Sequence, residues 1–348
     1  MYVLTNEQRV LFQCLRGEPV LSLQGADPQR LLHLFMHHRL LPLSGPVREH
    51  LPPAMQSAWK QELSTQTLHS LKLSAELTNL LELLRSLGFT PFPLKGPPLA
   101  HMLFGDPGQR HFGDIDILLP EEQFFPAMET LRRAGYTRVY PEQLSKRQWR
   151  TYAAYKKDAG LRHRERGIFL ELHYGIHYHR MLEKRHAWWF FQGPGHILIR
   201  GMKVPVMQPE ALFIYLVFHG AQHRFSRLFW LRDVDACLRN RPPDPEKVME
   251  MIRKTRLHRL LGVTMALTEK YFHTPVPGLF RPCMQERRIE KLVRHVEKHI
   301  LTSEQPPRKD KWMRHVYYLQ LKPGLRYKWA VGVSILQRWR IKRFFGGY

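Results

Sequence analysis

The chain has 348 residues, and its 43% hydrophobic content is enough to fill the core of one large domain or two smaller ones. Its formal net charge is +24, which favours polyanionic partners such as nucleic acid, nucleotides or acidic lipid headgroups. The longest clean apolar run, 211–218, is well short of the roughly 18 residues of a membrane span, and no basic-then-apolar leader opens the sequence. Cys14, Cys237 and Cys283 are too widely spaced to indicate a disulfide framework or a zinc ribbon. We therefore expect a globular protein of the cytoplasm, a reducing compartment.

The first 88 residues have a helical pattern. Its clearest part is a long helix in which leucines recur at positions 73, 77, 80, 81 and 84, with Gly88 as its terminating residue. The prolines of 89–96 predict a short extended stretch, and 97–105 predicts one or two helical turns that begin at proline. A turn at 105–110 then leads into the next element.

The middle of the chain mixes strands and helices. Residues 113–119, GDIDILL, predict a strand, 121–135 a helix capped by glycine, and 136–140 another strand. A basic interval at 145–166 leads into a strand at 167–174, and 196–207 predicts a hairpin with Gly201 at its bend. From residue 209 onward the segments are helical again, with 239–247 as a linker between helices.

This order of elements predicts an α+β protein in three regions. They are an N-terminal helical region at 1–88, an α/β core with a small mixed β-sheet at 89–208, and a C-terminal helical region at 209–348 that ends in a basic tail.

Two carboxylates stand out in the strand at 113–119. Because side chains alternate between the faces of a strand, Asp114 and Asp116 project from one side and Ile115 and Ile117 from the other. Two adjacent carboxylates raise each other's pKa unless a positive charge lies between them, and the matching ion is a hard divalent cation such as Mg²⁺. A solvated polar face is the alternative explanation, but Gly113 supplies backbone that can approach phosphates closely.

The strand at 167–174 carries a third acid. Glu171 shares one face with Phe169 and His173, and leucines occupy the other face. If the two strands are neighbours, three carboxylates converge. Such a set can hold two metal ions roughly 4 Å apart, as in phosphoryl transfer.

Three blocks of sequence carry a family resemblance: PLKGPPLAHMLFGDPGQRHFGDIDILLP, then LELHYGIH, then QPEALFIYLVFHGAQHRFSRLFWLRDVDACL. In this order they resemble the uncharacterised nucleotidyltransferase family of the polymerase-beta-like nucleotidyltransferase superfamily, over about 94–238. The resemblance implies a mixed sheet with helices, a two-ion Mg²⁺ or Mn²⁺ site, and transfer of a nucleoside monophosphate from an NTP to a hydroxyl acceptor. The acceptor classes left open are RNA, especially tRNA, a small molecule and a protein side chain.

The resemblance also implies roles for individual residues. Asp114, Asp116 and Glu171 would be the catalytic residues and the metal ligands, and Glu171 would also help to deprotonate the acceptor. Candidate supporting residues are His173, His219 and Asp233.

Nucleotide binding would involve a separate set of residues. Lys95 and Gly96 form the family's lysine-glycine element, and Arg110 is its arginine ahead of the two aspartates. The superfamily usually has Gly-Ser or Gly-Gly before the carboxylates, whereas Pro97 follows the glycine here, so Gly105, Gly108 or Gly113 is the candidate substitute for cradling phosphate. Lys156, in the basic interval, would neutralise phosphate or guide a polyanionic acceptor; a solvated loop lysine is the alternative.

Two histidine groups allow other interpretations. His219 and His223 have the i, i+4 spacing of a zinc site, but leucines on the same face favour core or interface histidines. His173, His177 and His179 lie close enough in sequence for a transition-metal cluster, but the aspartate pair prefers a hard ion and no cysteine accompanies the histidines.

Two further functional hypotheses come from the basic charge. One is a catalytically silent nucleotidyltransferase fold that acts as a basic nucleic-acid-binding protein. The other is a peripheral membrane protein that uses residues 324–348, where aromatic and basic residues alternate; docking of this segment on the protein's own core is the simpler explanation.

Overall fold

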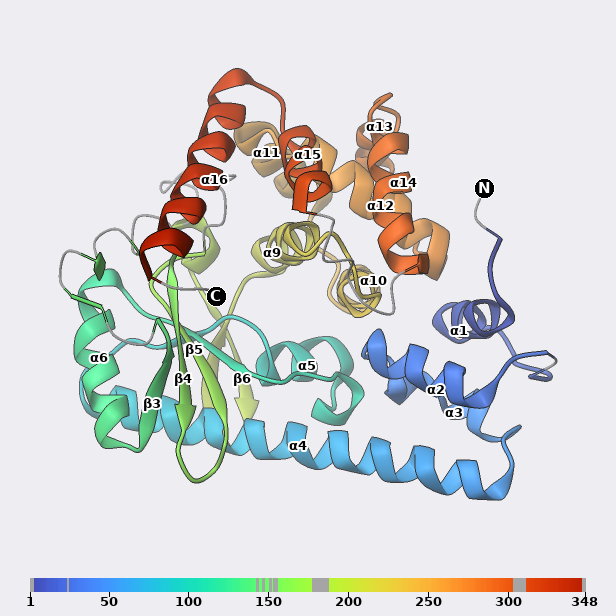
Figure 1. Ribbon diagram of the computed structural model, residues 1–348, viewed down its shortest axis with the longest axis horizontal. Helices are drawn as coiled ribbons and strands as arrows, with labels where there is room; N and C mark the ends of the chain where they lie inside the picture. The colour runs from blue at the N-terminus through green and yellow to red at the C-terminus, as the bar shows by residue number, and fades with distance from the viewer. Residues whose placement is uncertain are drawn as a thin grey trace. The chain divides into compact units, whose positions relative to one another are not determined.

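A computed structural model describes residues 3–345 except 24, 142–143, 146–147, 150–151, 153–155, 177–187 and 303–310 (Figure 1). Its α-helices are α1 (Asn6–Arg16), α2 (Pro28–His37), α3 (Gly45–Arg48), α4 (Pro53–Ser86), α5 (Pro97–Phe104), α6 (Glu121–Arg133), α9 (Pro209–Gln222), α10 (Phe229–Asn240), α11 (Pro245–Thr255), α12 (His258–Phe272), α13 (Arg281–Met284), α14 (Ile289–Thr302), α15 (Lys311–Leu321) and α16 (Leu325–Phe345). Its strands are β1 (Phe92–Pro93), β2 (Ile115–Leu118), β3 (Tyr136–Tyr140), β4 (Asp158–His163), β5 (Phe169–His173), β6 (Gly195–Ile199) and β7 (Met202–Val206). Short 3₁₀ helices are η1 (Leu41–Leu43), η2 (Pro107–Gln109), η3 (Trp188–Phe191) and η4 (Gly278–Phe280).

The chain divides into two compact units, each assembled from separate segments. The first unit comprises Met1–Leu68, Leu103–His111 and Pro209–Lys322, and the second comprises His69–Met102, Phe112–Gln208 and Pro323–Tyr348. The units are therefore not consecutive stretches of sequence, and the three-region division remains a prediction.

The second unit is built on a small mixed sheet. Within the described residues, five strands follow the order β1-β2-β5-β4-β3, and β6 and β7 form a separate hairpin. The β2–β5 pair is parallel, whereas the β1–β2, β5–β4 and β4–β3 pairs are antiparallel. This arrangement confirms the expected α+β class, in which a small mixed sheet is flanked by helices.

One face of the sheet forms the hydrophobic core of this unit. Ile115 and Ile117 of β2 and Leu170 and Leu172 of β5 are all at most 1% exposed. They pack with apolar residues of two helices, namely Leu73, Leu77, Leu80, Leu81 and Leu84 of α4 and Phe124, Ala127 and Leu131 of α6. The side chains that alternate with them are thereby directed to the opposite face, where the polar residues described below lie.

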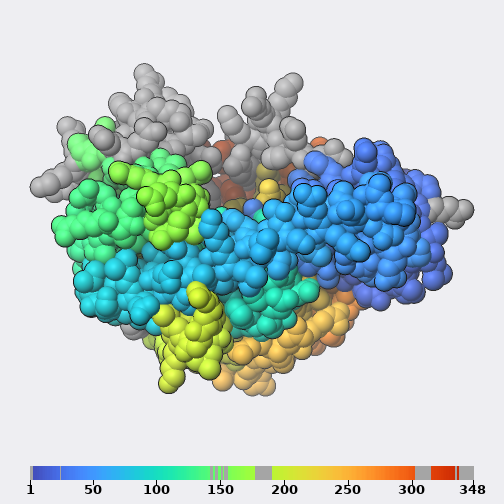
Figure 2. All heavy atoms as spheres, turned by 90° about the horizontal axis from the view of Figure 1, so that it is seen from below, coloured from blue at the N-terminus to red at the C-terminus, as the bar shows by residue number. Residues whose placement is uncertain are grey.

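The two hairpins of the second unit are tied to the C-terminal half of α4. Lys72 donates a hydrogen bond to the carbonyl of Arg166, beyond β4, and Arg85 donates one to the carbonyl of Lys203 in β7. Figure 2 shows the surface of this helix, with the tips of the β4–β5 and β6–β7 hairpins on its two sides. Helix α4 therefore contacts both the β4–β5 hairpin of the sheet and the separate β6–β7 hairpin.

Most of the expected elements of the second unit are confirmed. The long helix ends at Ser86, the strands at 113–119, 136–140 and 167–174 form, and the β6–β7 hairpin turns at Arg200 and Gly201, both with positive φ. Strand β4 is an element that the sequence did not indicate, because it lies inside the basic interval. Part of that interval, including Lys146 and Arg147, lies outside the described residues.

The first unit is helical. Helix α12 packs on α9, α10, α13 and α14, and α1 packs on α2 and α12. Helix α16 belongs to the second unit; Tyr327 and Val331 on it are buried, whereas Trp329 is 76% exposed. In the part of the chain that the structure describes, no helix combines the length and apolar character that crossing a bilayer requires.

Candidate metal and nucleotide site

The pairing of β2 with β5 brings two acids together. In this parallel pair Asp116 is in register with Glu171, and Leu118 with His173. Residues in register on adjacent strands project to the same face, so Asp116 and Glu171 both leave the apolar core face. The sheet therefore creates the convergence of carboxylates that the sequence predicts if these strands are neighbours.

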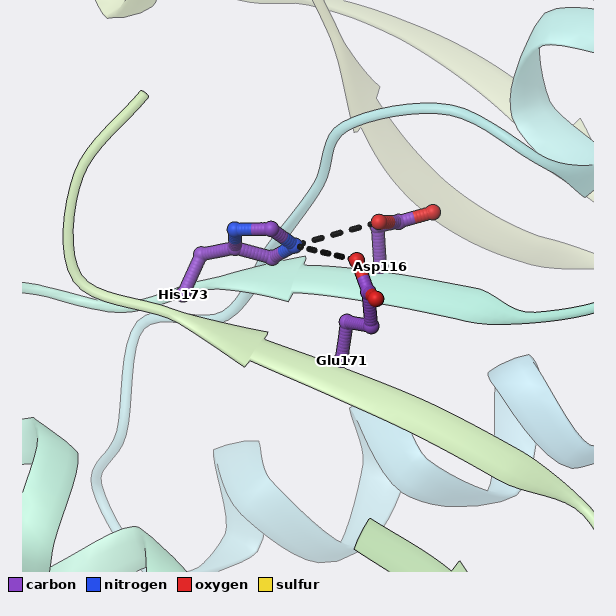
Figure 3. Close-up of side chains that lie close together, drawn as sticks. All are labelled: Asp116, Glu171 and His173. Carbon is purple, nitrogen blue, oxygen red and sulfur yellow. Dashed lines mark hydrogen bonds and ion pairs between the residues drawn. The ribbon is translucent and has the colours of Figure 1, made fainter. Parts of the chain in front are cut away.

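The imidazole of His173 is directed at both acids, as Figure 3 shows. Its Nε2 lies 3.1 Å from Asp116 Oδ1 and 3.5 Å from Glu171 Oε2. One ligand atom from each of the three residues lies within 4.8 Å of the others, which is close enough for a shared metal ion. His173 thus belongs to the cluster itself rather than to its surroundings.

Lys95 adds a second positive charge. Its Nζ forms an ion pair with Asp116 Oδ2 over 3.1 Å, and the described residues provide no further hydrogen-bond donor to this oxygen. The Asp116 side chain is fully buried, whereas the side chains of Lys95 and Glu171 are about one fifth exposed. The site therefore has a buried end at Asp116 and an open end at Glu171.

The pKa values of the cluster diverge for identifiable reasons. Burial raises the pKa of Asp116 to about 6, although Lys95 and His173 act in the opposite direction. Burial also favours the neutral form of Glu171, but hydrogen bonds and charge from His173, together with Lys95 and Tyr140, hold its pKa below the usual range. Burial opposes protonation of His173, but the two carboxylates raise its pKa to about 10. Both carboxylates therefore favour the protonated form of His173.

These observations fit a divalent cation site. Two carboxylates and an imidazole converge, and one of the carboxylates, that of Asp116, is fully buried. Buried acids of this kind require a positive charge. A metal ion would supply that charge in place of the proton on His173.

Asp114 is less closely integrated than expected. It precedes β2, is half-buried, and is not in the group of described residues whose ligand atoms lie within 4.8 Å. Its charge nevertheless acts to raise the pKa of Asp116. Gly96 reaches this segment, since its φ is +74° and a Cβ there would lie 3.5 Å from the carbonyl oxygen of Asp114. Gly113 is exposed beside Asp114, so both glycines are near the carboxylates.

Arg110 forms an ion pair with another side chain of the first unit. Its Nε and Nη2 each donate a 2.8 Å hydrogen bond to the carboxylate of Asp233, and both side chains are buried. This bidentate pair ties the 103–111 segment to α10. No sequence pattern indicated this pair, and the phosphate-binding role of Arg110 remains a prediction.

The other predicted residues have different surroundings. Lys156 Nζ lies 4.0 Å from Asp158 Oδ1 and 5.9 Å from the centre of the Tyr140 ring. His219, on α9, stacks on Tyr215 and meets the ring of His223 edge-on. These ring contacts match the interpretation of His219 as a packing residue. The histidines at 177 and 179 lie outside the described residues.

Sequence reasoning missed two residues near the cluster. Tyr140 donates a 2.7 Å hydrogen bond to Glu171 Oε1. Asp158 is 1% exposed and is in register with His173 across the β4–β5 pair. The available signal for Tyr140 was its place at the end of a predicted strand; for Asp158 it was a lone acid after basic residues.

A mixed sheet that presents acids from two adjacent strands, with helices packed around it, has the architecture of a nucleotidyltransferase. The profile of the family described as "Uncharacterised nucleotidyltransferase" matches residues 24–273. The chain belongs to this family, which confirms the resemblance seen in its sequence blocks.

Two solved structures are similar to the chain at low identity. A lincosamide antibiotic adenylyltransferase, LnuA, solved with lincomycin bound, is 18% identical with a TM-score of 0.33, over 47% of this chain and 96% of its own. An antigenic nucleotidyltransferase-like protein from Paracoccidioides brasiliensis is 14% identical with a TM-score of 0.30, over 67% of this chain and 87% of its own. No curated protein matches the sequence.

Proposed function

We propose that this protein is a divalent-metal-dependent nucleotidyltransferase that moves a nucleoside monophosphate from an NTP to a hydroxyl acceptor. The observation that carries the proposal is the in-register pairing of Asp116 with Glu171 across two parallel strands, in a chain of the nucleotidyltransferase family. In the reaction the acceptor oxygen bonds to the α-phosphorus, the bond from that phosphorus to the bridging oxygen breaks, and pyrophosphate leaves. The acceptor hydroxyl loses its proton.

The acids of the cluster would hold the metal. Asp116 and Glu171 are the proposed ligands, with Asp114 as a further ligand from the start of β2. Because His173 and Tyr140 favour ionised Glu171, we assign it a ligand role rather than that of proton acceptor. A bound pair of Mg²⁺ or Mn²⁺ ions would neutralise the triphosphate and favour ionisation of the attacking hydroxyl.

Basic residues would bind the phosphates. Lys95 holds its ammonium group beside Asp116, where the triphosphate of a metal-bound NTP requires a counter-charge. The exposed Gly113 leaves the nearby backbone accessible to phosphate oxygens, and we assign Lys156 to the same substrate. The net charge of +24 favours a polyanionic acceptor such as RNA.

The test is transfer of label from each of the four α-labelled NTPs, with Mg²⁺ or Mn²⁺, into RNA, protein and small-molecule fractions. The parent protein is compared with Asp116→Asn and Glu171→Gln. A matched control is Glu129→Gln, which removes an exposed acid of α6 that pairs with Arg132 and lies outside the cluster. We expect transfer by the parent and the control, and loss of at least about 100-fold in both cluster variants.

Three results would contradict the proposal. Equal transfer by Asp116→Asn and the parent would show that the cluster takes no part in the reaction. Transfer in the absence of divalent metal would show that the reaction does not require the ion. If no fraction is labelled, and RNA binding persists in Asp116→Asn without metal while weakening steeply with salt, the protein acts as a basic nucleic-acid-binding protein instead.

A further inference from the structure

Tyr140 holds one oxygen of the Glu171 carboxylate. Its phenol donates a hydrogen bond to Oε1 over 2.7 Å, while the other oxygen, Oε2, lies 3.5 Å from His173 Nε2. Hydrogen bonds to an ionised carboxylate are stronger and more directional than those between neutral groups. The carboxylate is therefore fixed at both oxygens, by side chains from two strands.

The phenol reaches Glu171 across an intervening strand. Strand β4 lies between β3 and β5, and neighbouring strands are about 4.8 Å apart, so the side chain spans two such intervals. The span is possible because the residue between them is Gly160, which is in register with both Tyr140 and Glu171. A Cβ at Gly160 would lie 2.3 Å from the Tyr140 ring and 2.9 Å from Phe169. The glycine is required for space, since its φ is not in the left-handed region.

An irregularity in β3 brings the ring to this place. The pairing of β3 with β4 shifts between Arg138 and Tyr140, so that Tyr140 lies opposite Gly160. An irregularity of this type redirects a side chain relative to the regular alternation of a strand. The register shift and Gly160 together place the phenol over β4.

We infer that Tyr140 is a positioning residue of the cation site, which orients the Glu171 carboxylate toward Asp116 through the clearance that Gly160 leaves. This assignment rests on the proposed function, because it concerns the same carboxylate. Tyr140 would not contact the ion or the substrate itself. Without the phenol Glu171 can rotate, and loss of a group that orients a ligand typically lowers metal affinity roughly 10- to 100-fold.

The test measures Mn²⁺ binding to the full chain without nucleotide, by titration calorimetry and by electron paramagnetic resonance of free Mn²⁺. Tyr140→Phe keeps the ring and removes the hydroxyl. The matched control is Tyr136→Phe, whose hydroxyl donates a 2.6 Å hydrogen bond to the buried Glu76 outside the cluster. We expect Tyr140→Phe to weaken Mn²⁺ binding roughly 10- to 100-fold, and Tyr136→Phe to leave Mn²⁺ affinity unchanged while lowering thermal stability.

A second variant tests the clearance over β4. Gly160→Ala keeps the hydroxyl but displaces the ring, and should weaken Mn²⁺ binding as much as Tyr140→Phe does. Its control is Gly195→Ala in β6, where a Cβ would lie at an ordinary 3.4 Å from Val206. Both substitutions break the same hydrogen bond, from Tyr140 to Glu171. The double variant should therefore bind Mn²⁺ no more weakly than either single variant does.

Several outcomes would overturn the inference. They are unchanged Mn²⁺ affinity in Tyr140→Phe, an equal loss in Tyr136→Phe, and failure of the parent chain to bind Mn²⁺ at all. Failure of the proposed function has a different signature: Mn²⁺ binds the parent and is weakened by Tyr140→Phe, but no NTP transfers label to any fraction. In that case the positioning role stands and the reaction does not.

Discussion

Loss of the Asp233 carboxylate should strongly destabilise the first unit. Asp233 accepts two 2.8 Å hydrogen bonds from Arg110, and its charge also favours the protonated form of the buried Arg232, whose pKa burial lowers to about 10. Breaking a buried ion pair by removing one partner costs about 3–5 kcal/mol, because the other charge stays in a poorly solvated position. Two cations depend on this carboxylate, so we expect Asp233→Asn to lie toward the upper end of that range.

Urea unfolding, followed by both tryptophan fluorescence and circular dichroism, measures this loss in free energy of unfolding. Glu250→Gln is the control, because it breaks an exposed ion pair with Lys254 and should change stability far less. Replacing both members of the buried pair, Arg110→Met with Asp233→Leu, should recover much of the loss, since no charge is then stranded. If Asp233→Asn costs no more than Glu250→Gln, the burial argument is wrong.

Three other predictions concern the cluster and the helix packing. The pKa of His173 in the folded state, about 10, exceeds the 6.5 of an unperturbed histidine, so its contribution to stability is fully present below pH 6.5 and is lost as pH rises toward 10; urea midpoints across this window should fall in metal-free parent protein relative to His173→Gln, and parallel curves would refute the point. A divalent ion at 100 times its dissociation constant should raise the unfolding free energy of the parent by about 2.7 kcal/mol, and that of Asp116→Asn by much less, in thermal melts with and without chelator. Gly262→Ala should destabilise by at least about 1–3 kcal/mol, because its Cβ would lie 2.1 Å from the carbonyl oxygen of Cys283. Gly332→Ala, with nothing within 4 Å, should stabilise α16 by roughly 0.5–1 kcal/mol, and equal effects of the two substitutions in thermal melts would contradict this packing argument.

The strands that carry the acids could be read from the sequence, because alternation is a local property. In β2 and β5 each acid lies between apolar residues of a buried face, so its opposite orientation follows directly. That Asp116 meets Glu171 does not follow from either strand alone. The convergence of the two acids was expected only if β2 and β5 are neighbouring strands, and the structure pairs these strands.

The features that the sequence did not indicate also depend on contacts between residues far apart in the chain. Strand β4 was hidden because Arg162 and His163 interrupt its short apolar run, and its pairing with both β3 and β5 compensates for that weak pattern. Tyr140 acquires its role from a register shift and from a glycine on another strand. Arg110 was expected from the sequence to bind nucleotide, but its partner in the structure is Asp233 on α10, far along the chain. Residue patterns show which faces are polar and leave open which polar groups meet.

The parallel β2–β5 pair also makes formation of the Asp116–Glu171–His173 cluster depend on the order of folding. His173 and Asp116 are 57 positions apart in sequence, and α6, β3 and β4 lie between them. Pairing of distant strands is the slow part of sheet formation, because the loop must close before any contact compensates for the lost chain entropy. The cluster therefore forms only after this whole segment has closed. A divalent ion that binds this cluster would therefore stabilise chains whose sheet is complete relative to chains that are still partly folded.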